Sequence, residues 1–323
     1  MHKVLEDLGK IGIIPVIKID DPEKAVPLAK ALISGGIPCA EVTFRTAQGE
    51  EAIRRMAAEV PGILVGAGTV LTTDQVDRAI KAGAKYIVSP GFNPKVVAYC
   101  IEKGIPVTPG CSNPSDIELA LEAGLEVVKF FPAEQAGGLD YIKAVAAPYP
   151  GLKFIPTGGI NASNIGKYIA YNKILACGGS WMVGADLINA GDFGKITALA
   201  REAIFNIFGF SVAHFGVNAK STEAAAKTAA LFNTLFGFPV IKDGNSSVFA
   251  GDYIEIMKLP TASGSYGHIG IGTNSLVRAQ AYLEGLGVVF DPSSVKTGPD
   301  GQKTVIFARD EILGFSWHLV QKK

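Results

Sequence analysis

Eight short apolar segments recur through the first two thirds of the chain, and stretches with helical periodicity separate them. One such stretch, residues 21–36, opens on Asp-Pro and ends on Gly-Gly, which are start and stop signals of a helix. Strands that alternate with helices form right-handed βαβ units, whose parallel sheet is buried on both faces. The apolar segments span residues 11–19, 39–44, 63–70, 86–91, 106–110, 127–131, 154–159 and 174–183.

Eight repeats without a dinucleotide-binding fingerprint favour a closed (β/α)8 TIM barrel in the α/β class. The Gly-Ala-Gly at 66–68 is no such fingerprint, because Leu71 occupies the position of the third glycine. A doubly wound open sheet is the alternative. A helix at 192–208 closes this region and Gly209 marks a joint, so we predict a first domain over residues 1–208.

The last third of the chain contains an internal repeat. Segments 214–220 and 268–274 each precede a helical stretch, and each helical stretch is followed by short strands and turns. The repeat distance from His214 to His268 is 54 residues. This pattern predicts a smaller α+β domain of two βαβββ modules over residues 211–323.

The composition excludes several classes of partner. The 30 basic and 30 acidic residues cancel, which argues against nucleic acid or an anionic membrane as a partner. The N-terminal apolar run ends at Asp20 and Asp21, so we expect neither a signal peptide nor a membrane span. The scattered cysteines form no Cys-X-X-Cys pair, as is typical of reduced thiols in a soluble cytoplasmic protein; they are Cys39, Cys100, Cys111 and Cys177.

Lys129 is a charged residue inside the apolar run 127–131, and burying a lysine is costly unless it is paired or neutral. A structural lysine would extend its ammonium to solvent or pair with a carboxylate. Alternatively, apolar surroundings favour a neutral amine, which can attack a ketone and form a Schiff base. Both interpretations stay open on Lys129 alone.

Polar residues and glycines gather at the C-terminal ends of the other predicted strands, where barrel enzymes place their active sites. Turns of bare glycine after the seventh and eighth strands favour a phosphate site, because their N–H groups can approach an anion closely. A helix after Asn161 should add its dipole. The strand-end residues are Glu41, Thr43, Arg45, Thr69, Pro90, Gly91, Thr157, Gly158, Gly159, Gly178, Gly179 and Ser180.

Glu41 lies within a strand, where a carboxylate needs a cation or a catalytic task. It can shuttle protons beside a Schiff-base lysine, or form a structural ion pair with Arg45 or Lys129, and the two roles are compatible. The Arg45 guanidinium suits a substrate carboxylate. Together these residues indicate a ketone that carries a carboxylate at one end and a phosphate at the other.

Six motifs resemble those of the 2-keto-3-deoxy-6-phosphogluconate (KDPG) aldolases, which also act on 4-hydroxy-2-oxoglutarate (KHG). They occur in the order EVTFRT, GAGTVL, SPGFN, KFFPAE, PTGGI and GGSWM, and the resemblance covers residues 4–208. It implies a class I, cofactor-free lyase on a (β/α)8 barrel, commonly a homotrimer, of the Entner–Doudoroff pathway. One departure lies at Asn113–Asp116, where Thr-Pro-Ser-Glu is more usual, but Asn is itself a good helix cap.

The resemblance implies that Lys129 is the Schiff-base nucleophile and Glu41 the general acid/base. It also implies the substrate-binding residues Arg45, Thr69, Pro90, Phe131, Thr157, Gly158, Gly159, Gly179 and Ser180. The expected reaction is cleavage of KDPG to pyruvate and glyceraldehyde 3-phosphate. The alternatives are cleavage of KHG to glyoxylate and pyruvate, or a sensor that binds a phosphorylated acid without turnover.

The βαβββ repeat resembles the glyoxalase and extradiol dioxygenase (vicinal oxygen chelate) superfamily, whose metal ligands come from the first and last strands of each module. Strand alternation should place the four corresponding side chains on one face, and apolar neighbours such as Phe215 and Val217 against helices. Three imidazoles and a carboxylate suit a divalent metal. The alternatives are a site that has lost its metal and an oligomer clamp. The four residues are His214, Glu255, His268 and His318.

Overall fold

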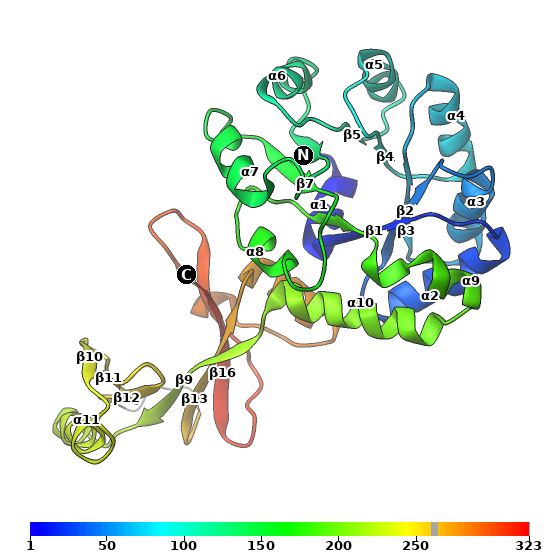
Figure 1. Ribbon diagram of the computed structural model, residues 1–323. Helices are drawn as coiled ribbons and strands as arrows, with labels where there is room; N and C mark the ends of the chain where they lie inside the picture. Colours follow the sequence, from blue (N-terminus) through cyan, green and yellow to red (C-terminus); the bar gives the residue numbers. More distant parts are fainter. Residues whose placement is uncertain (260–263, 323) are drawn as a thin grey trace. The chain divides into compact units, whose positions relative to one another are not determined.

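The computed structural model describes residues 1–259 and 264–322, and the chain divides into two compact units, Met1–Ile207 and Phe208–Lys323. In the first unit, strands alternate with helices that lie outside them (Figure 1). Its strands are β1 (Ile13–Ile17), β2 (Cys39–Thr43), β3 (Leu64–Gly68), β4 (Ile87–Val88), β5 (Val107–Thr108), β6 (Val127–Phe130), β7 (Lys153–Pro156) and β8 (Cys177–Gly179).

The helices of the first unit follow the strands in the predicted alternation. They are α1 (Lys3–Ile11), η1 (Pro22–Lys24), α2 (Ala25–Ser34), α3 (Gly49–Glu59), α4 (Thr73–Ala82), α5 (Pro94–Glu102), α6 (Pro114–Glu122), α7 (Gly138–Ala146), α8 (Ile165–Ile169), η2 (Trp181–Val183), α9 (Ala185–Ala190) and α10 (Phe193–Phe208). Across the part of the chain that the structure describes, no helix is both long and apolar enough to cross a membrane.

The strand pairs of the first unit are all parallel, which confirms the α/β prediction for this region. One sheet has the order β5-β4-β3-β2-β1-β8, and β6 pairs with β7. Isolated parallel bridges join Gly110 to Lys129 and Thr157 to Gly178, so the pairing continues around the eight strands of residues 1–207. Every residue of β1 and β2 is buried, as expected for a parallel sheet covered on both faces.

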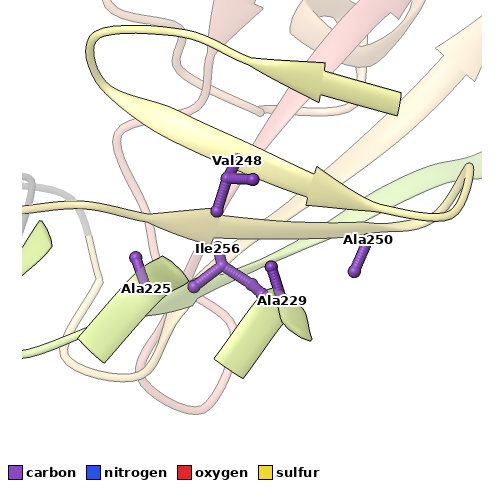
Figure 2. Close-up of a cluster of buried hydrophobic side chains, with 5 residues drawn as sticks. All are labelled: Ala225, Ala229, Val248, Ala250 and Ile256. Carbon is purple, nitrogen blue, oxygen red and sulfur yellow. The ribbon is translucent and has the colours of Figure 1, made fainter. Parts of the chain in front are cut away.

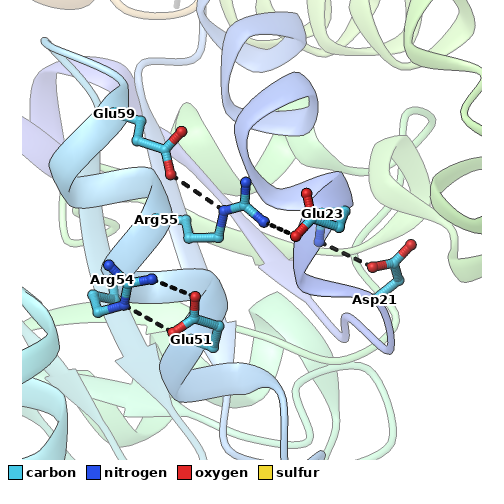
Figure 3. A network of polar contacts seen from close by, with 6 residues as sticks. All are labelled: Asp21, Glu23, Glu51, Arg54, Arg55 and Glu59. Atoms are coloured by element: carbon cyan, nitrogen blue, oxygen red, sulfur yellow. Dashed lines mark hydrogen bonds and ion pairs between the residues drawn. The ribbon is translucent and has the colours of Figure 1, made fainter.

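Local caps and ion pairs fix the helices. Asn113 caps α6 by accepting a hydrogen bond from the backbone N–H of Asp116 at 3.0 Å, so the departure at this position keeps its cap. Figure 3 shows a network in which Arg55 of α3 contacts Glu59, with Nε to Oε1 at 3.2 Å, and also Glu23 of η1. The carboxylates are largely exposed, so each pair contributes at most about 1 kcal/mol.

The described part of the second unit has the βαβββ order twice. The first copy comprises β9 (Ser211–Asn218), α11 (Thr222–Phe236), β10 (Val240–Asp243), β11 (Ser247–Ala250) and β12 (Ile254–Met257). The second comprises β13 (Gly267–Thr273), α12 (Leu276–Gly285), η3 (Pro292–Ser294), β14 (Lys296–Thr297), β15 (Lys303–Phe307) and β16 (Phe315–Gln321). Antiparallel pairing of β9 with β13 joins the copies into one sheet of order β10-β11-β12-β9-β13-β16-β15-β14.

Helix α11 packs on one face of this sheet through small side chains. Ala225 and Ala229 contact Val248 and Ala250 of β11 and Ile256 of β12 (Figure 2). Alternation places Glu255 on the opposite face.

The expectation that helices would also cover Phe215 and Val217 is wrong. The two side chains are 41% and 46% exposed. They lie on β9, whereas the buried contacts of α11 are with β11 and β12.

Candidate active site and candidate metal centre

Lys129 and Glu41 meet in the interior of the first unit. The Lys129 side chain projects from β6 and Glu41 from β2, and Lys129 Nζ lies 3.4 Å from Glu41 Oε1. Only 5% of Lys129 and 3% of Glu41 is exposed. The sequence left the partner of Glu41 open between Arg45 and Lys129, and the structure pairs it with Lys129. A buried amine beside a carboxylate that can take its proton suits nucleophilic catalysis as well as a structural ion pair.

Small neighbours make room for Glu41. A Cβ on Gly68 of β3 would lie 2.3 Å from Glu41 Oε1, so that strand position must lack a side chain. The Tyr86 hydroxyl, fully buried beside this pair of strands, donates to the carbonyl of Ala40 at 2.9 Å, and burial raises the pKa of Tyr86 well above its usual value. The strands therefore hold the carboxylate in a pocket shaped for it.

Arg45 and Thr69 lie together at the ends of β2 and β3. Arg45 Nε donates to Thr69 Oγ1 at 3.3 Å. Thr69 has a φ of 59°, in the left-handed region that a β-branched residue rarely adopts. Strain of this kind concentrates at functional sites, where the surrounding structure holds a residue in an unfavourable conformation.

A glycine turn follows β7, but the second predicted turn is wrong, because Gly178 and Gly179 lie within β8 and pair with β1. Gly158 and Gly159 have φ values of 100° and 79°, which only glycine adopts without strain. Thr157 Oγ1 is buried without a hydrogen-bond partner, and a Cβ on Gly178 would lie 2.2 Å from it. The threonine hydroxyl therefore remains available to a ligand, as buried polar groups otherwise find partners.

A cavity of about 390 Å³ brings some of the predicted site residues together, but Lys129, Glu41, Thr69 and Pro90 do not line it. Predicted residues that line it are Arg45, Phe131, Thr157, Gly158, Gly159, Gly179 and Ser180. Lys129 lies behind the lining residue Phe131, whose ring centroid is 5.3 Å from Nζ. Thr69 contacts the lining residue Arg45, and Pro90 lies against Gly110, the bridge partner of Lys129.

A turn capped by Asn161 leads into the short helix α8, which begins at Ile165 and has 5 residues. The Asn161 side chain accepts from Ser163 N at 2.9 Å, and the Asn161 carbonyl accepts from Ile165 N at 3.1 Å. Asn161 N donates to the Asn164 side chain at 2.9 Å, and Asn164 Nδ2 donates to the Gly159 carbonyl at 3.0 Å. These bonds hold the start of the helix against the glycine turn, but 5 residues are too few to carry a substantial macrodipole.

Lys18 also lines the cavity, and the sequence reasoning missed it. It directly follows β1, and its ammonium lies 3.0 Å from Asp20. The signal for Lys18 is its position at the C-terminal end of the first predicted strand, 11–19.

The second unit brings three histidines together from β9, β13 and β16. Their ring centroids are 5.2 Å apart for His214 and His268, 5.0 Å for His214 and His318, and 5.1 Å for His268 and His318. One ligand nitrogen from each lies within 4.8 Å of the other two. We call His214, His268 and His318 the histidine triad.

Glu255 of β12 borders the histidine triad on one side. Its Oε2 lies 3.1 Å from His268 Nε2 and 3.3 Å from His214 Nε2, while Oε1 accepts from the Ser247 hydroxyl at 2.6 Å. Burial alone would raise the pKa of Glu255, but hydrogen bonds from His268 and Ser247 hold it at about 2. The carboxylate is therefore ionised.

Two triad nitrogens have no hydrogen bond although they are buried, namely His214 Nε2 and His318 Nδ1. Burial lowers the pKa of His214 and brings that of His318 to about 3, so both imidazoles are neutral at physiological pH. Neutral imidazoles with unused nitrogens are the ligand form for divalent zinc, iron, nickel or manganese. The three imidazoles thus fit a metal, and Glu255 borders them as a hydrogen-bond partner of His268.

Comparison with known proteins identifies the family. The family model for KDPG and KHG aldolases matches residues 4–199. The chain belongs to the KDPG and KHG aldolase family. A Treponema pallidum protein, 2-dehydro-3-deoxy-phosphogluconate aldolase, is 51% identical over 204 residues, covering 63% of this chain and 97% of that relative. The Escherichia coli KHG/KDPG aldolase is 45% identical over 192 residues, covering 59% and 90%.

Solved structures of the aldolase family have the same fold as part of this chain. A Zymomonas mobilis KDPG aldolase, crystallised with 3-phosphoglycerate, superposes with a TM-score of 0.58 at 42% identity and covers 62% of this chain and 94% of its own. A Legionella pneumophila KDPG aldolase, with pyruvate captured as a covalent carbinolamine, gives a TM-score of 0.60 at 36% identity and covers 62% and 97%. The predicted aldolase family is thereby confirmed.

Proposed function

We propose that the first unit is a class I aldolase, a carbon–carbon lyase that cleaves KDPG to pyruvate and glyceraldehyde 3-phosphate. The observation that carries the proposal is the buried contact of 3.4 Å between Lys129 and Glu41 beside the glycine-lined cavity. Membership of the aldolase family supports it. The proposed fold of this unit is a closed (β/α)8 barrel, which the continuous parallel pairing supports.

The reaction begins with attack of the neutral Lys129 amine on the C2 ketone. Glu41 moves the protons that convert the carbinolamine to an iminium with loss of water. The iminium is an electron sink, so the C3–C4 bond breaks as a base takes the proton of the C4 hydroxyl. Glyceraldehyde 3-phosphate leaves, the enamine is protonated at C3, and water releases pyruvate and free lysine. The water lost in the first half returns in the second, so the net reaction is a cleavage.

The cavity supplies a place for each end of the substrate. Arg45, held by Thr69, takes the carboxylate, and the unpartnered Thr157 hydroxyl binds the pyruvoyl part. The phosphate lies between the glycine turn after β7 and the end of β8, where Gly158, Gly159, Gly179 and Ser180 present backbone N–H groups and Lys18 adds a positive charge. Pro90 and Phe131 complete the surroundings of Lys129.

Turnover of paired substrates tests this proposal. The purified chain is assayed for pyruvate release with KDPG and with KHG, and the kcat/KM for KDPG should be higher because KHG lacks the phosphate. A higher kcat/KM for KHG would make KHG the substrate. Ligand-dependent melting without any turnover would instead support the sensor. A homotrimer in the cytoplasm is part of the proposal and rests on family resemblance and on the scattered positions of the four buried cysteines.

For the second unit we propose a glyoxalase-like domain that binds a divalent metal. The histidine triad holds the metal through imidazole nitrogens, with Glu255 as the adjacent carboxylate; the carrying observation is two buried triad nitrogens without hydrogen bonds. A bound metal would supply Lewis-acid chemistry there. Metal analysis of purified protein tests this: about one metal per chain is expected, and a His214→Gln, His268→Gln variant should lose it. Equal metal content in the wild-type chain and in this double variant would exclude the site.

A further inference from the structure

The cavity around the histidine triad is much larger than a metal requires. Its volume is about 490 Å³, within the range of small-molecule sites, whereas a water molecule occupies about 30 Å³. Three protein ligands also leave coordination positions open, as in catalytic rather than structural metal sites. The space and the open positions both indicate a second ligand.

Aromatic and aliphatic side chains form most of the cavity wall. The Phe307 ring lies 4.3 Å from that of His318, and the Phe249 ring lies 5.9 Å from that of His214, so aromatic groups flank the triad on two sides. Met257, Val305 and Val320 are the other apolar lining residues. Apolar walls lower the local polarity and strengthen electrostatic attraction within the cavity.

Two lysines lie where the cavity opens. Lys242 belongs to β10 and Lys296 to β14, the opposite edge strands of the sheet, yet both line the same cavity and both are exposed. Lys242 Nζ lies 5.6 Å from the Phe249 ring centroid, which places it next to the aromatic neighbour of His214. Curvature of the sheet thus brings two positive charges from its two edges to one opening.

Within the described part of the chain, Lys242 and Lys296 have no acidic partner. Among residues 1–259 and 264–322, neither ammonium lies within 4.0 Å of a carboxylate, whereas Lys258 nearby pairs with Asp243 at 2.6 Å. Glu255 is the acidic residue in the lining, and it is already bound by Ser247 and His268. A divalent metal would add two further positive charges. The lining is therefore complementary to an anion.

We propose that this cavity binds a small organic anion, which ligates the metal at the histidine triad and directs a carboxylate or phosphate between Lys242 and Lys296. The inference rests on the proposed metal site. It assigns a second ligand-binding site to the chain, formed entirely within the second unit and separate from Lys129.

The test uses the full chain, stripped of metal with a chelator and reloaded with Co(II), whose visible spectrum reports its ligands. Oxalate and inorganic phosphate are titrated separately, with ethylene glycol as the neutral comparison. We expect a saturable spectral change with at least one anion and none with the glycol. The Lys242→Met, Lys296→Met variant should bind that anion about tenfold more weakly while retaining Co(II). The anion that binds more tightly shows whether the cavity recognises a carboxylate or a phosphate.

Lys227→Met is the matched control. It removes one exposed lysine from α11, on the other face of the sheet, and should leave anion affinity unchanged. Co(II) binding without an anion response, or unchanged anion affinity in the double lysine variant, would overturn the ligand proposal alone. No Co(II) binding beyond that of the His214→Gln, His268→Gln variant would overturn the metal site and the ligand proposal together. Neither result bears on Lys129, which pyruvate trapping tests separately.

Discussion

Lys129 and Glu41 are 88 residues apart in the sequence and in contact in the fold. The residue pattern predicted that each is buried at a strand end, because a lysine and a glutamate within apolar runs are unusual. It could not predict which cation Glu41 meets, since that depends on strand order and side-chain reach. The sequence reasoning also missed Lys18, which lies one residue past β1 and lines the cavity.

Replacing Glu41 by glutamine should lower kcat for KDPG cleavage by about 10²- to 10³-fold and change KM little. The amide keeps the shape of the side chain but cannot accept and return protons. Steady-state kinetics measure both constants, and Glu51→Gln on the surface of α3 is the matched control. A kcat within threefold of the wild-type value would show that Glu41 does not carry out the proton transfers.

Replacing Gly159 by alanine should raise KM for KDPG about tenfold and affect KHG cleavage less. The new Cβ would lie 2.6 Å from Cβ of Glu134, and a φ of 79° is strained for alanine, so the turn that surrounds the phosphate must shift. Gly151→Ala is the control, because a Cβ there meets nothing within 4 Å. Equal losses with both substrates would place the phosphate elsewhere.

Strand and helix order followed from the sequence, but element lengths did not. The run 86–91 predicted a strand, yet β4 covers Ile87–Val88, and Pro90 has no N–H to continue the ladder. The helix after Asn161 is short, with α8 covering Ile165–Ile169, and Asn164 ties its start to the Gly159 carbonyl. Such contacts are decided by tertiary geometry, which periodicity does not contain.

Helix α4 gives a direct test of local capping. Thr72 Oγ1 accepts from Gln75 N at 3.2 Å, and the Gln75 side chain accepts from Leu71 N at 2.7 Å, a reciprocal arrangement at the start of the helix. Thr72→Ala should lower the free energy of unfolding of the first unit by about 1 kcal/mol. Denaturant unfolding measures this, with Thr73→Ala as the comparison. Equal effects of the two changes would argue against the cap.

The two units of the chain were predicted from different kinds of sequence pattern, the first from motifs and the second from a repeat of strands and helices. Six motifs predicted the aldolase family, because each motif reflects chemistry at a strand end. The βαβββ repeat predicted the element order of the second unit, and alternation along strands predicted that the histidines share a face. The antiparallel pairing of β9 with β13, which brings His214 beside His268, joins strands about 54 residues apart and was not visible in any local pattern.

Residues 1–210 alone should retain KDPG cleavage within about threefold of the full chain. The pairs and cavity proposed for catalysis all lie in the first unit, and the relatives match little beyond its length. Loss of activity in the shortened chain, with its fold verified by circular dichroism, would show that the second unit contributes to the aldolase.

Removal of metal from the full chain with a chelator should leave aldolase activity unchanged, since the iminium supplies the electron sink.

Reductive trapping of pyruvate tests the nucleophile most directly. The full chain is mixed with pyruvate and borohydride, digested, and examined by mass spectrometry. We predict a reduced pyruvate adduct on Lys129, with the adduct absent in Lys129→Ala and present in Lys173→Ala, another lysine with restricted exposure. A folded protein that carries no adduct, or carries it on a different lysine, would contradict the assignment of Lys129 as the Schiff-base residue.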